Sequence, residues 1–305
     1  MPEEFPQLKR AFRIIAFDWD GTAVESRSAD ARPIAARIEQ LLELGVLSVV
    51  ITGTSFNNIS KQFSSFLEGP YNRNLYALTN RGSEVYGFDQ KSEPVLIQRR
   101  EASATEDLLL TKVAQAARDY VRYRGGPAID IVYNRLNRRK IDMIPEPEWA
   151  DPPKSRIGDL LRATEHRLRS GGITGGIKQL LDLAGKLLCE FGLESARLTS
   201  DAKFIEVGLT DKADSVAWLL DHLAPRVGAR PDQVLFASDE FGPIAGLTGG
   251  DFRMVTPASR ACVFVSLGPE PAGVPPQVLH IGGGPARFER LLEDQLQIHR
   301  ARFPR

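Results

Sequence analysis

A short apolar run that leads directly into two aspartates constrains this chain more than any other feature. Residues 13–17 (Arg-Ile-Ile-Ala-Phe) are mostly apolar, and Asp18-Trp19-Asp20-Gly21-Thr22 follows them at once. A short apolar run bounded by a turn signal is typical of a buried strand, in particular one of a parallel sheet. Open α/β sheets bind their ligands where such strands end, which is where Asp18 and Asp20 would emerge.

The two aspartates indicate a site of chemistry at the end of this strand. Residues two apart on a strand point to the same side, so both carboxylates could address one site. Two like charges so close are costly unless a cation lies between them or one of them takes a proton. The pair therefore indicates a metal site, an acid/base pair, or both. The alternative is a polar strand end followed by an Asp20-Gly21 turn, although four specific residues after an apolar run favour a functional site.

Composition narrows the class of protein and its partners. A chain of 305 residues with 42% hydrophobic content is long enough for two domains, or for one large one. Its 39 Lys and Arg balance its 39 Asp and Glu, so the net charge favours neither nucleic acid nor an anionic membrane as a partner. Cys189 and Cys262 match no zinc or redox spacing. The acidic start does not resemble a signal peptide and no apolar run reaches transmembrane length, so we expect a cytoplasmic protein.

Strands and helices alternate at both ends of the chain, which predicts a doubly wound parallel α/β sheet. After the first strand we expect a helix around Pro33, a strand over 46–51, a helix from Phe56 with an apolar face, and a strand over 75–79. That apolar face comprises Phe56, Ile59, Phe63 and Phe66. The pattern resumes with a helix over 213–223, strands over 234–239, 252–255, 262–266 and 278–281, and a last helix from Pro285.

The segment between these two parts has a different pattern. It begins with a hairpin over 83–98 and ends with short strands over 196–199 and 203–207. Between them we expect a helix over 104–124, paired strands over 128–133 and 139–144, and helices over 155–169 and 174–192. Helices grouped apart from hairpins predict an inserted α+β domain. The predicted organisation is a Rossmann-like core over 1–84 and 201–305, with an α+β cap over 85–200.

Four motifs now resemble those of the haloacid dehalogenase superfamily. Phe17-Asp18-Trp19-Asp20-Gly21-Thr22 is similar to its first motif, Asp-x-Asp-Gly-Thr after an apolar strand. Thr52, Lys212 and Asp239 stand in family order where the second, third and fourth motifs are expected. The turn over 79–84 (Thr-Asn-Arg-Gly-Ser-Glu) resembles the Asn-Gly turn that leads into the large cap of the Cof-type and trehalose-phosphatase-like members.

This resemblance implies a mechanism and a set of roles. Asp18 would be the nucleophile that forms an aspartyl-phosphate, and Asp20 would be the general acid and base. Mg²⁺ would be bound by Asp18, the backbone carbonyl of Asp20, and Asp239. Thr52, with nearby amides such as that of Gly53, would bind phosphoryl oxygens, and Lys212 would neutralise the nucleophile and the transferring group. Trp19 should point the opposite way, into the protein or toward the cap hinge.

Each of these residues has a structural alternative. Thr52 could cap the following helix, Lys212 could be a solvated lysine of a first helical turn, and Asp239 could be an N-cap. The fourth motif also departs from the family pattern, because Ser238 stands where the family has Gly. A second acid usually follows closely, and either Glu240 or Asp251 could complete the metal shell; the sequence does not choose between them.

The resemblance implies a Mg²⁺-dependent phosphatase that acts on a small phosphorylated metabolite, most plausibly a sugar phosphate. One alternative is a phosphomutase or phosphotransferase on sugar phosphates. Another is a catalytically silent binding protein with this fold, which the altered fourth motif suggests. We expect a small-molecule phosphate ester as the partner, neither nucleic acid nor membrane, and a monomer or homodimer.

Overall fold

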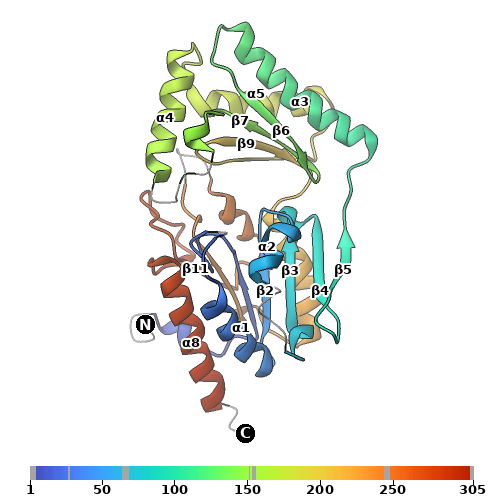
Figure 1. Cartoon of the computed structure of the whole chain (residues 1–305), viewed down its shortest axis with the longest axis vertical. Helices are drawn as coiled ribbons and strands as arrows, with labels where there is room; N and C mark the ends of the chain where they lie inside the picture. The colour runs from blue at the N-terminus through green and yellow to red at the C-terminus, as the bar shows by residue number, and fades with distance from the viewer. Residues whose placement is uncertain are drawn as a thin grey trace. The chain divides into compact units, whose positions relative to one another are not determined.

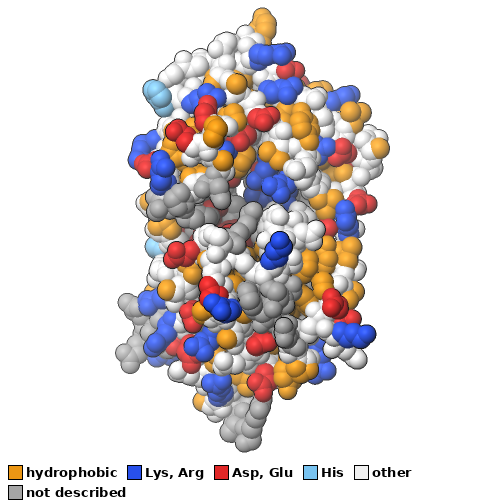
Figure 2. All heavy atoms as spheres, in the orientation of Figure 1, with side chains coloured by type: hydrophobic (Ala, Val, Ile, Leu, Met, Phe, Trp, Pro, Cys, Tyr) orange, Lys and Arg blue, Asp and Glu red, His pale blue; other side chains and the backbone are white. Residues whose placement is uncertain are grey.

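The chain folds into two compact units. The computed structural model describes residues 5–26, 28–63, 69–150, 152, 156–243 and 248–302. The core unit comprises Met1–Arg99, Lys212–Gly242 and Asp251–Arg305, and the smaller unit comprises Arg100–Asp211 and Pro243–Gly250. No helix among the described residues is long and apolar enough to cross a membrane. Positive and negative side chains are interspersed over the face drawn in Figure 2, in keeping with the balanced charge.

An eight-stranded sheet organises the core unit, in the order β12-β11-β10-β1-β2-β3-β4-β5 (Figure 1). The strands from β12 to β3 run parallel, whereas β4 and β5 are antiparallel to their neighbours. Their bounds are β1 Ile14–Phe17, β2 Leu47–Ile51, β3 Leu75–Thr79, β4 Glu84–Phe88, β5 Pro94–Arg99, β10 Val234–Ser238, β11 Val263–Ser266 and β12 Val278–His280. Every residue of β1, β2, β3 and β10 is buried, which is why these strands are nearly continuous apolar runs.

Helices cover both faces of this sheet, and successive residues of β1 alternate between the two cores. Ile15 and Phe17 belong to the cluster that includes residues of α1 (Arg32–Glu43) and α8 (Gly284–Arg302), two helices that pack together. Ile14 and Ala16 belong to the opposite cluster, with α6 (Lys212–Trp218) and the π-helical turn η7 (Leu219–Leu223). Helix α7 (Ala224–Arg226) continues that segment, and α2 (Phe56–Phe63) follows β2. This is the predicted doubly wound core. Phe66 lies outside the described residues.

The smaller unit is the predicted α+β insert. Its antiparallel sheet has the order β6-β7-β9-β8, with β6 at Asp130–Arg135, β7 at Arg138–Asp142, β8 at Arg197–Ser200 and β9 at Phe204–Gly208. Its helices are α3 (Ala104–Tyr123), α4 (Ile157–Ser170) and α5 (Gly176–Glu190), and α3 and α5 pack on the sheet (Figure 1). Helix α3 begins with a capping box in which the side chains of Ser103 and Glu106 each accept a hydrogen bond from the other's backbone N–H. All these elements match the predicted ones to within a few residues.

The units divide at other points than the predicted boundaries after residues 84 and 200. The hairpin β4–β5 extends the core sheet, because β4 pairs with β3, with Val85 opposite Leu78. Strands β8 and β9 belong to the smaller sheet, so the divisions fall after Arg99 and after Asp211. Strand β5 is the free edge of the core sheet, and Figure 2 shows hydrophobic side chains at the surface there, where Val95, Leu96 and Ile97 are exposed.

The strand predicted over 252–255 is wrong. This segment is a 3₁₀ helix, η9 (Gly250–Met254), in which the N–H of Val255 donates to the carbonyl of Phe252. A short apolar run cannot be assigned to strand or helix by periodicity alone. Here the helical turn buries both Asp251 and Met254, which are three residues apart. On a strand, side chains three residues apart would point to opposite faces of the sheet.

Candidate active site

The first motif forms a tight turn at the carboxyl end of β1. The N–H of Asp18 continues the strand by donating to the carbonyl of Ala237 (3.0 Å), and the N–H of Trp19 donates to Asp18 Oδ1 (2.8 Å). Trp19 points into the core as predicted, fully buried, and its Nε1 donates to Gln62 Oε1 (3.2 Å). Gly21 has φ +85°, a left-handed conformation that favours glycine. The turn therefore buries Trp19 and leaves Asp18 at the sheet edge.

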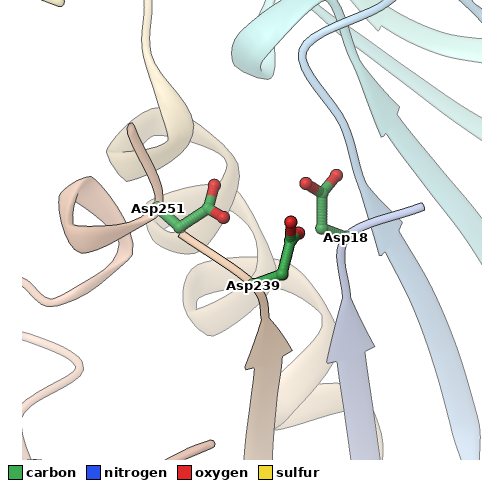
Figure 3. Close-up of side chains that lie close together, drawn as sticks. All are labelled: Asp18, Asp239 and Asp251. Carbon is green, nitrogen blue, oxygen red and sulfur yellow. The ribbon is translucent and has the colours of Figure 1, made fainter. Parts of the chain in front are cut away.

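Three carboxylates converge at this edge (Figure 3). Asp18 follows β1, Asp239 follows the neighbouring strand β10, and Asp251 comes from η9, the segment that leads on toward β11. Each offers one oxygen, and these oxygens all lie within 4.8 Å of one another. Asp239 and Asp251 are buried, whereas Asp18 is partly exposed. The predicted pair Asp18 and Asp239 thus lies together, with Asp251 as the third member; of the two acids that the sequence left open, Asp251 joins the cluster.

Lys212 lies against two of these carboxylates. As predicted, it begins helix α6; its Nζ is 3.1 Å from Asp18 Oδ2 and 2.5 Å from Asp251 Oδ1. Burial by itself would lower the pKa of this lysine, but the negative charges of Asp18 and Asp251 outweigh burial and raise the pKa above its usual value. Lys212 is therefore a buried ammonium that offsets part of the charge of the cluster, and the alternative of a solvated lysine is excluded.

Neighbouring side chains orient the carboxylates. Thr22 Oγ1 donates to Asp239 Oδ1 (3.0 Å), so the last residue of the first motif orients the fourth-motif acid. Ser238 Oγ donates to Asp251 Oδ2, which also accepts the backbone N–H of Glu240 (3.1 Å). Ser238 is the residue that departs from the family pattern, and its hydroxyl holds Asp251. Glu240 thus contacts Asp251 through its backbone N–H.

The donor set fits a hard divalent cation. Carboxylate oxygens are what Mg²⁺ prefers, at about 2.0–2.1 Å, and oxygens within 4.8 Å of one another can share one ion. The close approach of Gly21 supports this arrangement, because a Cβ there would lie 2.3 Å from Asp239 Oδ2. The side chain of Asp20 is not part of the three-carboxylate group. The resemblance assigns Asp20 a backbone carbonyl ligand and an acid/base role, and both assignments remain predictions.

Thr52 and Gly53 lie at the end of the adjacent strand, β2. Strands β1 and β2 are parallel with Phe17 opposite Val50, so the residues that follow them emerge side by side. Thr52 is buried, its N–H donates to the carbonyl of Leu78 (2.9 Å), and its Oγ1 accepts the N–H of Thr54 (3.3 Å). The loop after β2 is therefore ordered by its own hydrogen bonds at the same sheet edge as Asp18.

Sequence reasoning missed Glu270. This buried glutamate accepts the backbone N–H groups of Phe241 (2.8 Å) and Gly242 (2.8 Å) through its two carboxylate oxygens, and Ser266 Oγ donates to it as well (2.6 Å). It thereby fixes the chain just after Asp239. Its place in a Gly-Pro-Glu-Pro loop carries no catalytic signal, and only the fold brings it to the site.

A cavity of about 850 Å³ lies at the amino ends of the parallel strands of the core sheet. Its lining includes Arg13, Val46 and Gln233, which directly precede β1, β2 and β10. None of the clustered carboxylates lines it. It is distinct from the candidate active site, which lies where the parallel strands end.

Comparison with known proteins rests on structure. No protein-family profile matches the sequence, and the search of curated proteins gave no significant match. An N-terminally truncated, IMP-bound IMP-nucleotidase of Plasmodium falciparum has a TM-score of 0.60 and 12% identity, over 95% of this chain and 70% of its own. The chain has the haloacid dehalogenase fold.

A second structure with the same fold matches over nearly its whole length. The trehalose-6-phosphate phosphatase of Aspergillus fumigatus has a TM-score of 0.56 and 14% identity, over 96% of this chain and 95% of its own. The haloacid dehalogenase core with an inserted α+β unit, which the motifs predicted, is thereby confirmed. At these identities, what this chain shares with the two enzymes is the fold.

Proposed function

We propose that this protein is a Mg²⁺-dependent phosphatase that hydrolyses a small phosphate monoester, a sugar phosphate, through an aspartyl-phosphate intermediate. The observation that carries this proposal is the contact of Lys212 Nζ with Asp18 Oδ2 (3.1 Å) inside the cluster that Asp239 and Asp251 complete. Asp18 is the more exposed partner of this ion pair, with 14% of its side chain exposed against 5% for Lys212. A nucleophile must be reachable as well as held in place, and Asp18 meets both conditions.

Asp18 would attack phosphorus with one carboxylate oxygen while the alcohol leaves. The N–H of Trp19 holds Oδ1 (2.8 Å) and Lys212 holds Oδ2 (3.1 Å), so the carboxylate is oriented from two sides. Lys212 would also offset the charge that develops on the phosphoryl oxygens. A Mg²⁺ ion held by Asp18, Asp239 and Asp251 would supply the further positive charge that lets a carboxylate approach a phosphate dianion.

Asp20 would carry the proton in both half-reactions. It would protonate the leaving alkoxide as the phosphorus–oxygen bond breaks, and would then take a proton from the water that attacks the aspartyl-phosphate. Thr52 and the backbone N–H of Gly53 would donate to phosphoryl oxygens from the adjacent loop. The products are the free alcohol and inorganic phosphate, and Asp18 is regenerated.

The substrate class is proposed from the two neighbours. One is described as an IMP-nucleotidase and the other as a trehalose-6-phosphate phosphatase. Both substrates are phosphate monoesters of a sugar hydroxyl. The matches extend over at least 95% of this chain, so they include most of its inserted α+β unit. This part of the proposal rests on likeness of fold alone.

The test is a screen of phosphorylated metabolites with Mg²⁺ present, scored by release of inorganic phosphate. The panel includes trehalose 6-phosphate, IMP, hexose phosphates and p-nitrophenyl phosphate. Asp18→Asn should lower turnover at least about 10³-fold, because the amide is not a nucleophile. Asp182→Asn is the matched control, since Asp182 is exposed on α5 and pairs with Lys178. Turnover that survives in Asp18→Asn would sink the covalent mechanism, and an inactive wild type across the panel would sink the proposed function.

A further inference from the structure

The turn after β3 holds an arginine in a backbone conformation that arginine rarely adopts. Asn80, Arg81 and Gly82 have φ values of +50°, +54° and +85°, so three successive residues lie in the left-handed region. Gly82 adopts this conformation at little cost and asparagine tolerates it, but arginine has neither advantage. Strained backbone of this kind persists only where the surroundings enforce it, and it is concentrated at functional sites.

Hydrogen bonds tie this turn to the loop after β2. The N–H of Asn80 donates to the carbonyl of Thr54 (2.7 Å), and the N–H of Arg81 donates to the carbonyl of Thr52 (3.1 Å). The side-chain amide of Asn80 donates to Glu84 Oε2 (2.6 Å), which anchors the turn to β4. The backbone of Arg81 is thus held directly against the residue that would bind phosphoryl oxygens.

The side chain of Arg81 runs beside Gly53. A Cβ built on Gly53 would lie 3.7 Å from Arg81 Nε and 3.8 Å from Arg81 Cγ. The turn itself, η4 (Asn80–Gly82), packs against α6, the helix that Lys212 begins. Arg81 therefore lies between the Thr52-Gly53 loop and the helix that carries the buried lysine, all within the core unit.

The charges at the site call for a further cation. Lys212 already contacts two carboxylates, Asp18 and Asp251, and Asp239 adds a third negative charge. A phosphate dianion that enters such a site needs positive charge on its own oxygens as well. A guanidinium suits this task, because its fork of N–H groups matches two phosphate oxygens at once and it stays charged at any working pH.

We propose that Arg81 binds the phosphoryl group of the substrate. This inference rests on the proposed function and adds a residue to it that neither the motifs nor the comparisons assign. The strained turn then has a purpose, since it directs a side chain from β3 toward the oxygens held by Thr52 and Gly53. The alternative is that the arginine merely packs the turn.

Arg81→Gly separates the two readings. Glycine relieves the left-handed backbone while it removes the guanidinium, so the variant should unfold at the same temperature as the wild type or higher. With Mg²⁺ present, its KM and its dissociation constant for inorganic phosphate should rise about 10- to 100-fold, the range for lost hydrogen bonds to a charged group. Calorimetric titration of inorganic phosphate measures the second quantity without turnover. Arg290→Ala is the control, because Arg290 is exposed on α8 and pairs with Asp294.

A second variant, Arg81→Gln, keeps a non-glycine residue in the left-handed conformation and a polar side chain, but it removes the positive charge. It should also bind phosphate more weakly. If either variant is folded and binds phosphate as tightly as the wild type, the inference is overturned while the phosphatase proposal stands. If the wild type releases no phosphate from any ester, the proposed function fails, and the phosphate titration still decides whether Arg81 binds the anion.

Discussion

Replacement of Gly21 by alanine should disable the carboxylate cluster without unfolding the protein. A Cβ on Gly21 would lie 2.3 Å from Asp239 Oδ2, 2.7 Å from Asp239 Cγ and 2.9 Å from Asp239 Oδ1. Ordinary contacts between such atoms are about 3.5–4.0 Å, so the carboxylate has to move by roughly 1 Å. That movement breaks the hydrogen bond from Thr22 (3.0 Å) and takes Asp239 away from Asp18 and Asp251.

The size of the effect follows from the geometry. The φ of +85° at Gly21 imposes a backbone cost of about 1 kcal/mol on alanine. A misplacement of about 1 Å among reacting groups can lower turnover about 10²-fold. We therefore expect Gly21→Ala to lose about 10²-fold in kcat and to bind Mg²⁺ more weakly, with a modest loss in the free energy of unfolding.

Gly45→Ala is the matched control for the backbone cost. Gly45, which follows α1, has φ +81°, and among the described residues no atom other than those of its chain neighbours lies within 4 Å of the Cβ position. Both variants should lose about 1 kcal/mol of stability in a denaturant titration, but only Gly21→Ala should lose Mg²⁺ affinity in a calorimetric titration and turnover in a phosphate-release assay. Equal Mg²⁺ affinity and equal turnover in the two variants would refute the argument that Gly21 makes room for Asp239.

Two further predictions concern groups remote from the site. Burial lowers the pKa of His299. The positive charge of Arg302 lowers this pKa further, whereas the hydrogen bond to the Phe12 carbonyl (2.8 Å) raises it. Below about pH 6.5 the unfolded chain therefore binds more protons than the folded one. The free energy of unfolding should decrease as the pH is lowered through this range, and His299→Gln should weaken that dependence in denaturation curves. Burial, with a smaller contribution from the charge of Asp232, raises the pKa of the Cys262 thiol to about 12. At about pH 8 iodoacetamide should modify the native protein at the exposed Cys189 and leave the buried Cys262 unmodified. The intact mass of the native Cys189→Ser variant should therefore show no adduct. An adduct on that variant would contradict the burial of Cys262.

The sequence predicted the elements of both units because their signals are local. Continuous apolar runs identify β1, β2, β3 and β10, whose residues are buried on both faces. Helix α3 was expected over 104–124 and spans Ala104–Tyr123, and the structure adds the capping box of Ser103 and Glu106 at its start. The hairpin β4–β5 was also predicted, but it was assigned to the inserted segment, whereas in the structure it extends the core sheet. Strand pairing depends on contacts that an isolated hairpin pattern does not encode.

Within the candidate site, too, local signals were predicted from the sequence, whereas contacts between distant segments were not. Asp18, Asp239 and Lys212 were predicted from their place directly after a strand or at the start of a helix, and the structure brings the three together. The choice of Asp251 over Glu240 was left open, because it depends on how the chain returns from β10 toward β11. Ser238 decides it in the structure by donating to Asp251, a bond between residues that sequence alone treats as independent.

By itself, the sequence determined which segments become strands and helices and which acidic residues end the strands, since both follow from periodicity and neighbouring residues. Only the tertiary structure decided which residues meet: Asp251 with Lys212, Thr22 with Asp239, and Arg81 with the loop around Gly53. The physical reason is that hydrogen bonds and ion pairs act over a few ångströms, and these partners come within that range only when the sheet has formed.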